Sequence, residues 1–178
     1  MGKTGAMANL HFRLMALSLL FRDIIHPPEA MLNEAGIKAG FHVLDFGCGP
    51  GSYALPAAQT VGITGRVYAL DVHPLAVQRV QRLAVKKGLT NVQTILSDGM
   101  TNLPDGIIDV VLCYDMFHEL REPERVLAEL HRVLKPEGVL SFSDHHLREE
   151  AIISRVTGGG LFKLSGKGKK TYTFVKAR

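Results

Sequence analysis

The stretch that most constrains the fold is residues 43–51, where an apolar run ends abruptly in three glycines at alternate positions. Residues 41–46 are apolar and bounded by glycine on both sides, which is typical of a strand buried on both faces of a parallel sheet. The positions of Gly47, Gly49 and Gly51 carry no side chains that would keep a ligand off the backbone. A helix that begins directly after this turn directs free N–H groups at the ligand. The stretch therefore predicts a strand–turn–helix unit that binds a nucleotide-like ligand.

Asp45 lies near the end of this apolar strand, where an unpaired charge is costly to bury, so it needs a cationic or hydrogen-bonding partner. The third glycine falls one residue earlier than in the dinucleotide-binding fingerprint, and the next residue is Ser52. The sequence Asp-Phe-Gly-Cys-Gly-Pro-Gly resembles motif I of the class I S-adenosylmethionine-dependent methyltransferases. The resemblance implies that the methionyl end of the cofactor is held by Asp45, Gly47, Cys48, Gly49 and Gly51.

Two more acidic residues follow predicted strands. The strand over residues 66–70 leads into Asp71, at the place where a doubly wound sheet brings an acidic side chain within reach of a ribose. The strand over residues 92–96 leads into Asp98, and by the resemblance this carboxylate accepts a hydrogen bond from the adenine amino group. A nicotinamide-dependent dehydrogenase has no specific need for that second carboxylate. The resemblance implies four cofactor contacts here: Asp71, Val72, Asp98 and Gly99.

The rest of the chain predicts alternating helices and strands and a final β-hairpin. Further helices are predicted over 28–35, 53–61, 74–87, 123–134 and 147–156, and further strands over 107–114, 139–143, 161–164 and 171–176. The Leu-Lys-Pro-x-Gly passage before residue 139 also resembles the link that precedes strand five in these methyltransferases. The resemblance covers residues 36–176.

The fold that the resemblance implies is α/β: a Rossmann-like, doubly wound sheet of seven strands in the order 3-2-1-4-5-7-6, with strand seven antiparallel and helices on both faces. A chain of 178 residues with 46% hydrophobic and 21% charged residues is the size of one globular domain. We expect an N-terminal helical segment over residues 1–35 and a methyltransferase domain over residues 36–178.

The exit of the fourth strand, residues 114–120, is expected at the edge where open α/β sheets keep their ligands. We expect Tyr114 to contact the cofactor there. Methyl transfer from a sulfonium is an in-line displacement that depends largely on alignment of the reactants, so a catalytic base is not a general requirement. For a hydroxyl or protonated amine acceptor a base within about 3 Å helps, and the candidates are His118 first, then His145 and His146. A structural role for His118, which would only pack or cap its turn, remains the alternative.

Residues 7–25 predict a helix that is apolar over much of its circumference. Its uninterrupted apolar run is too short to span a bilayer, and no signal-peptide cleavage site follows it. Three roles are open: a helix packed on the domain, a lid over the acceptor site, or an interfacial membrane anchor. In the anchor, Arg13 and Arg22 meet lipid head groups. The apolar residues that enter the acyl boundary are then Phe12, Leu14, Leu17 and Phe21.

Three functions follow from these patterns. The first is a methyltransferase for a small, hydrophobic or lipid-like acceptor, similar to the ubiquinone-biosynthesis and type 11 groups, with S-adenosyl-L-methionine as cofactor and S-adenosyl-L-homocysteine as product. The second is an RNA or protein methyltransferase, and the third is a nicotinamide-binding oxidoreductase. Nucleic acid is disfavoured because the basic cluster over residues 163–170 lacks interleaved aromatic residues.

The histidine and cysteine pattern argues against a metal and for a reducing environment. Adjacent pairs such as His145-His146 lack the spacing that puts two ligands on one helical face, so no metal site is expected. The only cysteines, Cys48 and Cys113, lie in the glycine turn and in an apolar run, and neither indicates a disulfide framework. A cytoplasmic location is the default expectation. The oligomeric state is not predicted.

Overall fold

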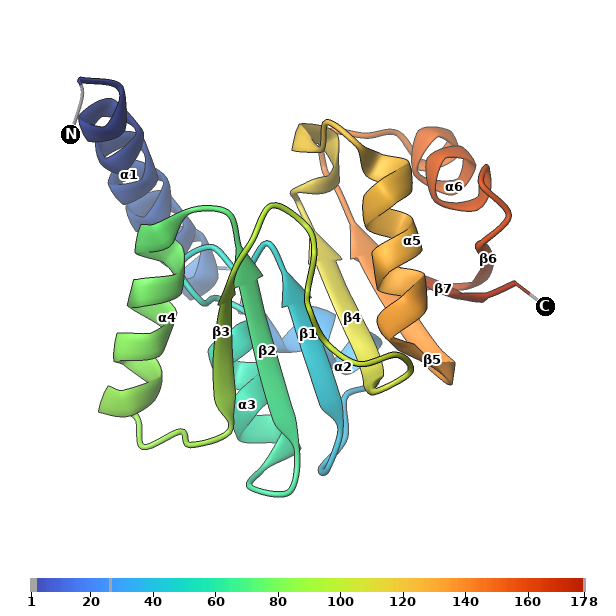
Figure 1. The fold of residues 1–178 in the computed structure, drawn as a ribbon, viewed down its shortest axis with the longest axis horizontal. Coiled ribbons are helices and arrows are strands. Elements are labelled where there is room, and N and C mark those ends of the chain that lie inside the picture. The colour runs from blue at the N-terminus through green and yellow to red at the C-terminus, as the bar shows by residue number, and fades with distance from the viewer. Residues whose placement is uncertain (1–2, 26, 178) are drawn as a thin grey trace.

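The computed structural model describes residues 3–25 and 27–177, which form one central sheet flanked by helices (Figure 1). The elements in chain order are α1 (Lys3–Ile25), α2 (Glu29–Glu34), β1 (His42–Phe46), α3 (Ala54–Val61), β2 (Arg66–Asp71), α4 (Pro74–Lys86), β3 (Val92–Leu96), β4 (Ile108–Tyr114), the 3-10 turn η1 (Phe117–Glu119), α5 (Pro123–Val133), β5 (Leu134–Ser143), α6 (Glu149–Thr157), β6 (Phe162–Lys167) and β7 (Tyr172–Lys176).

The sheet has seven strands in the order β3-β2-β1-β4-β5-β7-β6. Strands β1 to β5 pair in parallel, and β7 pairs antiparallel with both β5 and β6. This arrangement confirms the predicted α/β topology. The chain leaves β1 toward β2 on one side and later returns to β4 on the other, so the strand order reverses between β1 and β4. Ligands of open α/β sheets bind at such a switch point, outside the carboxyl ends of the strands.

Two separate apolar layers cover the two faces of the sheet, because successive side chains of a strand point to opposite faces. On one face, Leu44 and Phe46 of β1 pack in a cluster that includes buried residues of α5 and α6. On the other face, Val43 packs in a cluster with α2, α3 and α4. Asp45 alternates onto the same face as Val43, so the fold places a carboxylate in the layer beneath α3.

β5 differs from its prediction, because it begins at Leu134 rather than at Val139. The Leu-Lys-Pro-x-Gly passage is therefore the first half of a strand and not a turn. Leu134 pairs with Ile108 of β4, and the Lys135 ammonium lies 2.6 Å from the Asp109 carboxylate, so backbone and side chains both extend the strand. The helix and strand bounds predicted elsewhere agree with the structure to within a few residues.

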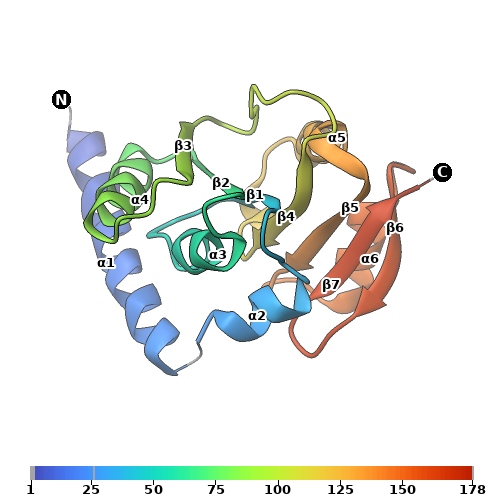
Figure 2. The same ribbon diagram turned by 90° about the horizontal axis from the view of Figure 1, so that it is seen from below.

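α1 lies alongside α4 at the edge of the molecule, and α2 follows it toward the β6–β7 hairpin (Figures 1 and 2). Phe12 is buried, and its ring stacks on that of His73 at 4.6 Å, so the expectation that Phe12 faces lipid is wrong. Leu14 and Phe21 are exposed. The side chain of Arg13 is outside the described part of the structure. Within residues 3–25 and 27–177, no helix has both the length and the apolar character needed to cross a membrane.

Candidate active site at the carboxyl edge of the sheet

The glycine turn after β1 is fixed to β2 by its own backbone. The N–H groups of Gly47 and Cys48 both donate to the Leu70 carbonyl, at 2.9 and 2.8 Å. Gly47, Gly49 and Gly51 have φ angles of 85°, 49° and 95°, which L side chains rarely adopt. A Cβ atom added at Gly49 would meet nothing within 4 Å. The turn is therefore rigid, and its backbone faces open space at Gly49.

The carboxylate of Asp71, at the end of β2, holds the same turn. One oxygen accepts the Gly49 N–H at 2.9 Å and the other accepts the His73 N–H at 2.8 Å. Because each carboxylate oxygen has two lone pairs, both oxygens keep capacity for further donors such as ribose hydroxyls. Asp71 thus links the turn to the start of α4, a role that its sequence position alone did not indicate.

Asp45 is the most unusual charge in the turn. Its side chain is 2% exposed, and its Oδ2 atom has no hydrogen-bond partner among the described residues. Burial, reinforced by the negative charge of Asp71, raises the pKa of Asp45 to about 7, although the Ala54 N–H donates to this carboxylate. A buried carboxyl group with an unused oxygen beside an open turn suits a cationic group, whose charge would favour the ionised form.

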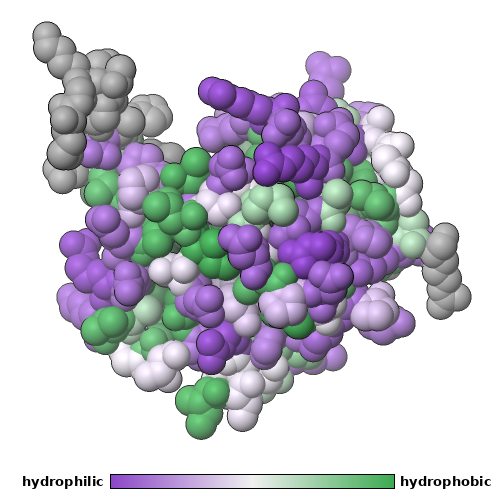
Figure 3. All heavy atoms as spheres, in the orientation of Figure 1, coloured by the Kyte–Doolittle hydropathy of each residue, from purple (hydrophilic) through white to green (hydrophobic). Residues whose placement is uncertain are grey.

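An apolar surface lies next to this turn, at the ends of β2 and β3. Val72 is 69% exposed and Leu96 is 57% exposed, and Figure 3 shows hydrophobic residues gathered over these strand ends. Asp98 lies exposed in the following loop, and the next amide, the Gly99 N–H, donates to Ser97 Oγ at 3.3 Å. An apolar platform rimmed by a carboxylate fits a flat aromatic base that carries an amino group. Sequence reasoning missed Leu96, whose only signal is its position as the last residue of β3.

Two of the predicted cofactor residues direct their side chains into the core instead. Cys48 is 3% exposed, its thiol lies 3.9 Å from the Gly49 carbonyl oxygen, and burial raises the pKa of this thiol. The hydroxyl of Tyr114 lies 2.7 Å from Ser141 Oγ on β5, and its ring packs edge-on against Tyr53. Burial also raises the pKa of Tyr114, which therefore stays a neutral phenol. Any contact of these two residues with a ligand is thus limited to the backbone.

The exit of β4 packs directly onto the glycine turn. A Cβ atom at Gly47 would lie 2.9 Å from Met116 Cγ, so only glycine fits at that position. Asp115, just before Met116, has a φ angle of 52°, and its N–H donates to the Ser143 carbonyl at 2.8 Å. The β4 exit is therefore held between the glycine turn and the end of β5, next to the expected cofactor.

His118, in η1, forms a close pair with Asp144, which directly follows β5. Its Nδ1 atom lies 3.0 and 2.9 Å from the two Asp144 oxygens, and its backbone N–H donates to Asp144 Oδ2 at 3.0 Å. Burial opposes ionisation of Asp144, but the hydrogen bonds from His118 and from the His146 N–H hold its pKa below the ordinary value. An ionised Asp144 keeps the proton of a neutral His118 on Nδ1, which makes Nε2 the acceptor atom.

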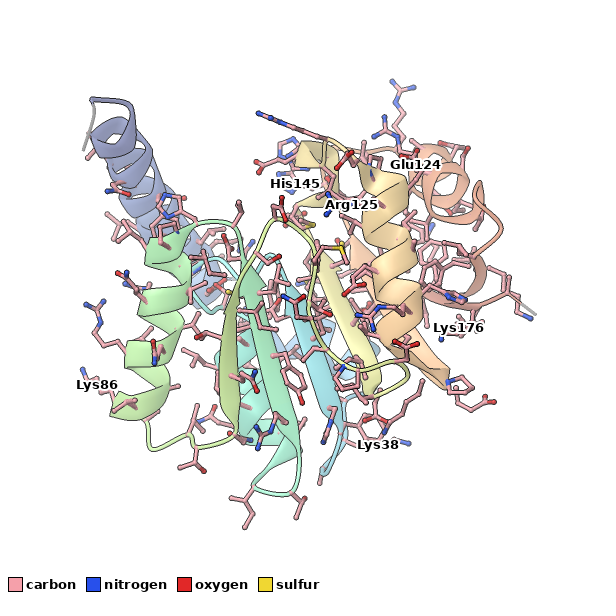
Figure 4. All side chains as sticks on the ribbon, viewed as in Figure 1. Lys38, Lys86, Glu124, Arg125, His145 and Lys176 are labelled. Carbon is pink, nitrogen blue, oxygen red and sulfur yellow. The ribbon has the colours of Figure 1, made fainter. Side chains whose placement is uncertain are left out.

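A second histidine–carboxylate pair connects this region to α1. His145 Nδ1 lies 2.7 Å from Asp115 Oδ1, and Arg22 of α1 lies 3.6 Å from Asp115 Oδ2. Arg22 also lies over the Tyr53 ring, 5.7 Å from its centroid. Figure 4 shows His145 at the carboxyl edge of the sheet, on the side of α5. The last turn of α1 therefore reaches the β4 and β5 exits.

Asp144 and Asp115 each pair with a histidine at this edge, and sequence reasoning assigned a role to neither. Asp144 directly follows β5, much as Asp71 stands at the end of β2, so the same rule could have found it. Asp115 and Arg22 could not be paired in this way, because 93 positions of chain separate them and only the packing of α1 brings them together. Among the described residues, no group of three or more histidine, cysteine or acidic side chains is arranged to hold a metal ion.

The fold and the turn together define a Rossmann-like domain with the strand order of class I methyltransferases. Residues 37–172 match a family model described as a methyltransferase domain. The chain therefore belongs to the methyltransferase domain family, and the predicted resemblance to class I S-adenosylmethionine-dependent methyltransferases is confirmed. The cofactor of this class is S-adenosylmethionine, also as predicted. An oxidoreductase that binds a nicotinamide cofactor is not the family to which this chain belongs.

Individual relatives agree with this assignment. A solved S-adenosylmethionine-dependent methyltransferase from Aquifex aeolicus is 31% identical with a TM-score of 0.74, over 84% of this chain and 89% of that one. The demethylmenaquinone methyltransferase of Geobacillus kaustophilus is 29% identical over 72% of this chain and 56% of its own length. A sterol 24-C-methyltransferase of Gibberella zeae is 32% identical over 76% of this chain and 36% of its own length. The chain thus spans about half or less of the curated relatives that it matches.

Proposed function

We propose that this protein transfers a methyl group from S-adenosylmethionine to a small, hydrophobic acceptor. The observation that carries the proposal is Asp45, a buried carboxyl group with an unused oxygen beside the open glycine turn, at the switch point of this sheet. A cofactor with an ammonium group and an adenosine suits this turn and the apolar platform beside it. When bound, the cofactor supplies a methyl group that its sulfonium already activates.

Each part of the cofactor has residues suited to hold it. Asp45 would face the ammonium group, and the backbone of the glycine turn would hold the methionyl end. Asp71 would accept hydrogen bonds from the ribose hydroxyls in addition to those from its two backbone donors. Val72 and Leu96 would hold the adenine ring, and Asp98 would accept a hydrogen bond from its amino group. Cys48, Gly99 and Tyr114 contribute through their backbones.

The acceptor is proposed to be hydrophobic because the curated relatives are named for demethylmenaquinone and sterol methylation. We propose His118 as the base that removes a proton from this acceptor through Nε2. Asp144 fixes the imidazole by accepting from Nδ1 and from the backbone. A hydroxyl, an acidic carbon or a protonated amine could supply the proton.

The last turn of α1 is proposed as one wall of the acceptor site, because Arg22 contacts both Asp115 and Tyr53. Most of α1 lies farther away, beside α4, so the helix walls the site at one end only. Its exposed apolar residues support a peripheral membrane contact. We also propose a cytoplasmic location, which suits two buried cysteines that form no disulfide.

Titration calorimetry tests the cofactor assignment. We expect the protein to bind S-adenosylhomocysteine and to ignore NADH. Asp98→Ala should weaken that binding by about 1 to 3 kcal/mol through the lost charged hydrogen bond. Glu137→Ala is the matched control, because it removes an exposed carboxylate from the first half of β5, away from the carboxyl ends of the strands. Equal losses in both variants would argue against the adenine contact.

A screen for homocysteine release tests the acceptor class. Phenols, quinones, amines and thiols are each offered with S-adenosylmethionine, and we expect turnover with an apolar acceptor that carries an ionisable proton. Turnover confined to an RNA or a protein would support the alternative function instead.

A further inference from the structure

α1 presents a continuous apolar row to solvent, which we call the α1 stripe. It consists of Leu10, Leu14, Leu17, Phe21 and Ile25, which are 57% to 67% exposed. Successive members are three or four positions apart, so they lie on one side of the helix. The buried residues Phe12 and Ala16 face α4 instead. Packing of α1 on its own domain therefore does not account for the α1 stripe.

Beside the stripe lies a groove of about 500 Å³ between α1 and α4, the α1–α4 groove. It is lined by Phe12, Ala16, Leu17, Leu75, Gln78, Arg79 and Arg82. The Arg79 Nε atom is buried without a hydrogen-bond partner, and neither arginine forms an ion pair within residues 3–25 and 27–177. α4 contains no acidic residue. The groove therefore combines apolar walls with two guanidinium groups that lack an anionic partner.

We propose that this face docks on an anionic phospholipid bilayer. The α1 stripe enters the acyl boundary, and a lipid phosphate in the α1–α4 groove accepts hydrogen bonds from Arg79 and Arg82. Guanidinium groups match phosphate oxygens in geometry as well as in charge. The inference rests on the proposed peripheral membrane contact and adds the class of lipid.

Charge favours a bilayer over a second copy of the chain. Pairing two copies through this face would bring two sets of unpaired guanidinium groups together. The one acidic residue of α1, Asp23, is already bonded to Arg22. A bilayer instead offers phosphates at the depth where an interfacial helix lies. The position is also useful, because the end of α1 that carries Arg22 reaches the acceptor site and a membrane stores hydrophobic acceptors.

Vesicle co-sedimentation of the full chain tests the proposal. We expect binding to vesicles that contain phosphatidylglycerol, weaker binding to pure phosphatidylcholine, and a loss of the difference at high salt. Arg79→Gln with Arg82→Gln should weaken binding to the anionic vesicles about tenfold or more. The matched control is Lys38→Gln with Lys176→Gln, which removes the same charge from residues that point away from α4 in Figure 4.

The stripe has its own pair of variants. Leu14→Ser with Phe21→Ser should abolish binding to both kinds of vesicle, whereas Ile63→Ser should not, although Ile63 is 93% exposed in the turn before β2. Equal binding to neutral and anionic vesicles, or equal losses in the arginine and lysine variants, would overturn the lipid class. A dimer in sedimentation that the stripe variant abolishes, without vesicle binding, would identify a second copy as the partner.

Folding and cofactor binding are checked separately. Arg82→Gln alone alters an exposed side chain, so it reports on the head-group contact even if the double variant unfolds. S-adenosylhomocysteine titration of each variant shows whether the cofactor site is intact. A protein that binds vesicles but not S-adenosylhomocysteine would refute the proposed function and leave the membrane inference standing. A protein that binds S-adenosylhomocysteine but no vesicles would refute the membrane inference and leave the proposed function standing.

Discussion

At the residue scale, the burial of Asp45 opposes folding, and we propose that this carboxylate serves to bind the cofactor. Its folded pKa of about 7 lies above the ordinary value of about 3.9, so the folded state binds the proton more tightly than the unfolded state. Stability of the free protein therefore falls as pH rises from about 4 to about 7, and the full penalty applies above that range. We predict that Asp45→Asn raises the melting temperature of the free protein at pH 8 and weakens S-adenosylhomocysteine binding by about 1 to 3 kcal/mol.

Thermal melts at two pH values check this prediction. At pH 4 the wild-type carboxyl is already protonated in the folded state, so the variant should gain little there. Cofactor affinity of the wild type should rise between pH 6 and pH 8 as Asp45 ionises, and the Asn variant should lack this rise. A variant less stable than the wild type at pH 8 would contradict the account.

His118 and Asp144 call for separate tests, because His118 would contact the acceptor whereas Asp144 would position the His118 imidazole. We predict that His118→Ala lowers kcat by about 100-fold or more and leaves cofactor affinity nearly unchanged. Asp144→Asn should lower kcat and alter the pH profile of kcat, since it removes the carboxylate that fixes the imidazole proton on Nδ1.

The control for this pair is His145→Ala, which removes the histidine bonded to Asp115 instead. Steady-state kinetics on the acceptor found by the screen compare the three variants. If His145→Ala alone loses turnover, the base has been assigned to the wrong histidine. Unchanged turnover in His118→Ala would leave that residue a structural role.

At the element scale, Glu129 of α5 fastens the long connection between β3 and β4. Its carboxylate accepts the N–H and the hydroxyl of Thr101 and two N–H groups of Arg132. These bonds, the Arg132 bonds foremost, lower the pKa of Glu129 to about 2. The stabilisation is present above the unfolded pKa of about 4.3 and is lost as pH falls toward 2.

We predict that Glu129→Gln lowers the free energy of unfolding by about 2 kcal/mol at pH 7. Urea unfolding measures this loss, and the difference from the wild type should shrink below about pH 4, because Glu129 of the unfolded wild type takes up a proton there while the folded carboxylate stays ionised down to about pH 2. Glu124→Gln, an exposed change on the same helix, serves as the control. A difference that stays constant down to pH 2 would show that charge is not the cause.

At the scale of the whole molecule, α1 packs on the outside of the domain. Its buried residues Phe12 and Ala16 form a small cluster with Ala76, separate from the two layers that cover the sheet. We propose residues 36–178 as the methyltransferase domain and residues 1–35 as an N-terminal segment. We predict that deleting residues 1–25 leaves cofactor binding intact, abolishes vesicle binding and reduces turnover, because the wall at Arg22 is lost.

Circular dichroism and titration calorimetry on the truncated chain come first, and turnover on a soluble acceptor follows. Full turnover without vesicle binding would limit α1 to membrane contact. A truncated chain that fails to fold would show that α1 is an integral packing helix, which is the third role that its sequence left open.

The sequence by itself determined the α/β succession of strands and helices and the place of the glycine turn, from apolar runs of strand length and glycines that need positive φ angles. The strand order came from the resemblance to class I methyltransferases. Asp45 and Asp71 were singled out by their positions near strand ends, and the adenine contact of Asp98 is an expectation from the same resemblance. The observed sheet has the expected strand order. Because the carboxyl ends of parallel strands lie at one edge of a sheet, the residues that follow these strands come together there.

Only the tertiary structure decided which side chains of the site bond to one another. Three of these contacts join distant segments: Asp71 accepts the Gly49 N–H, Asp144 bonds to His118, and the Tyr114 hydroxyl bonds to Ser141 in the core. The fate of α1 was undecided for the same reason, because a helix that is apolar on most sides has no intrinsic preference for the side that packs. The stacking of Phe12 on His73 fixes which side of α1 packs on the domain and leaves the α1 stripe exposed.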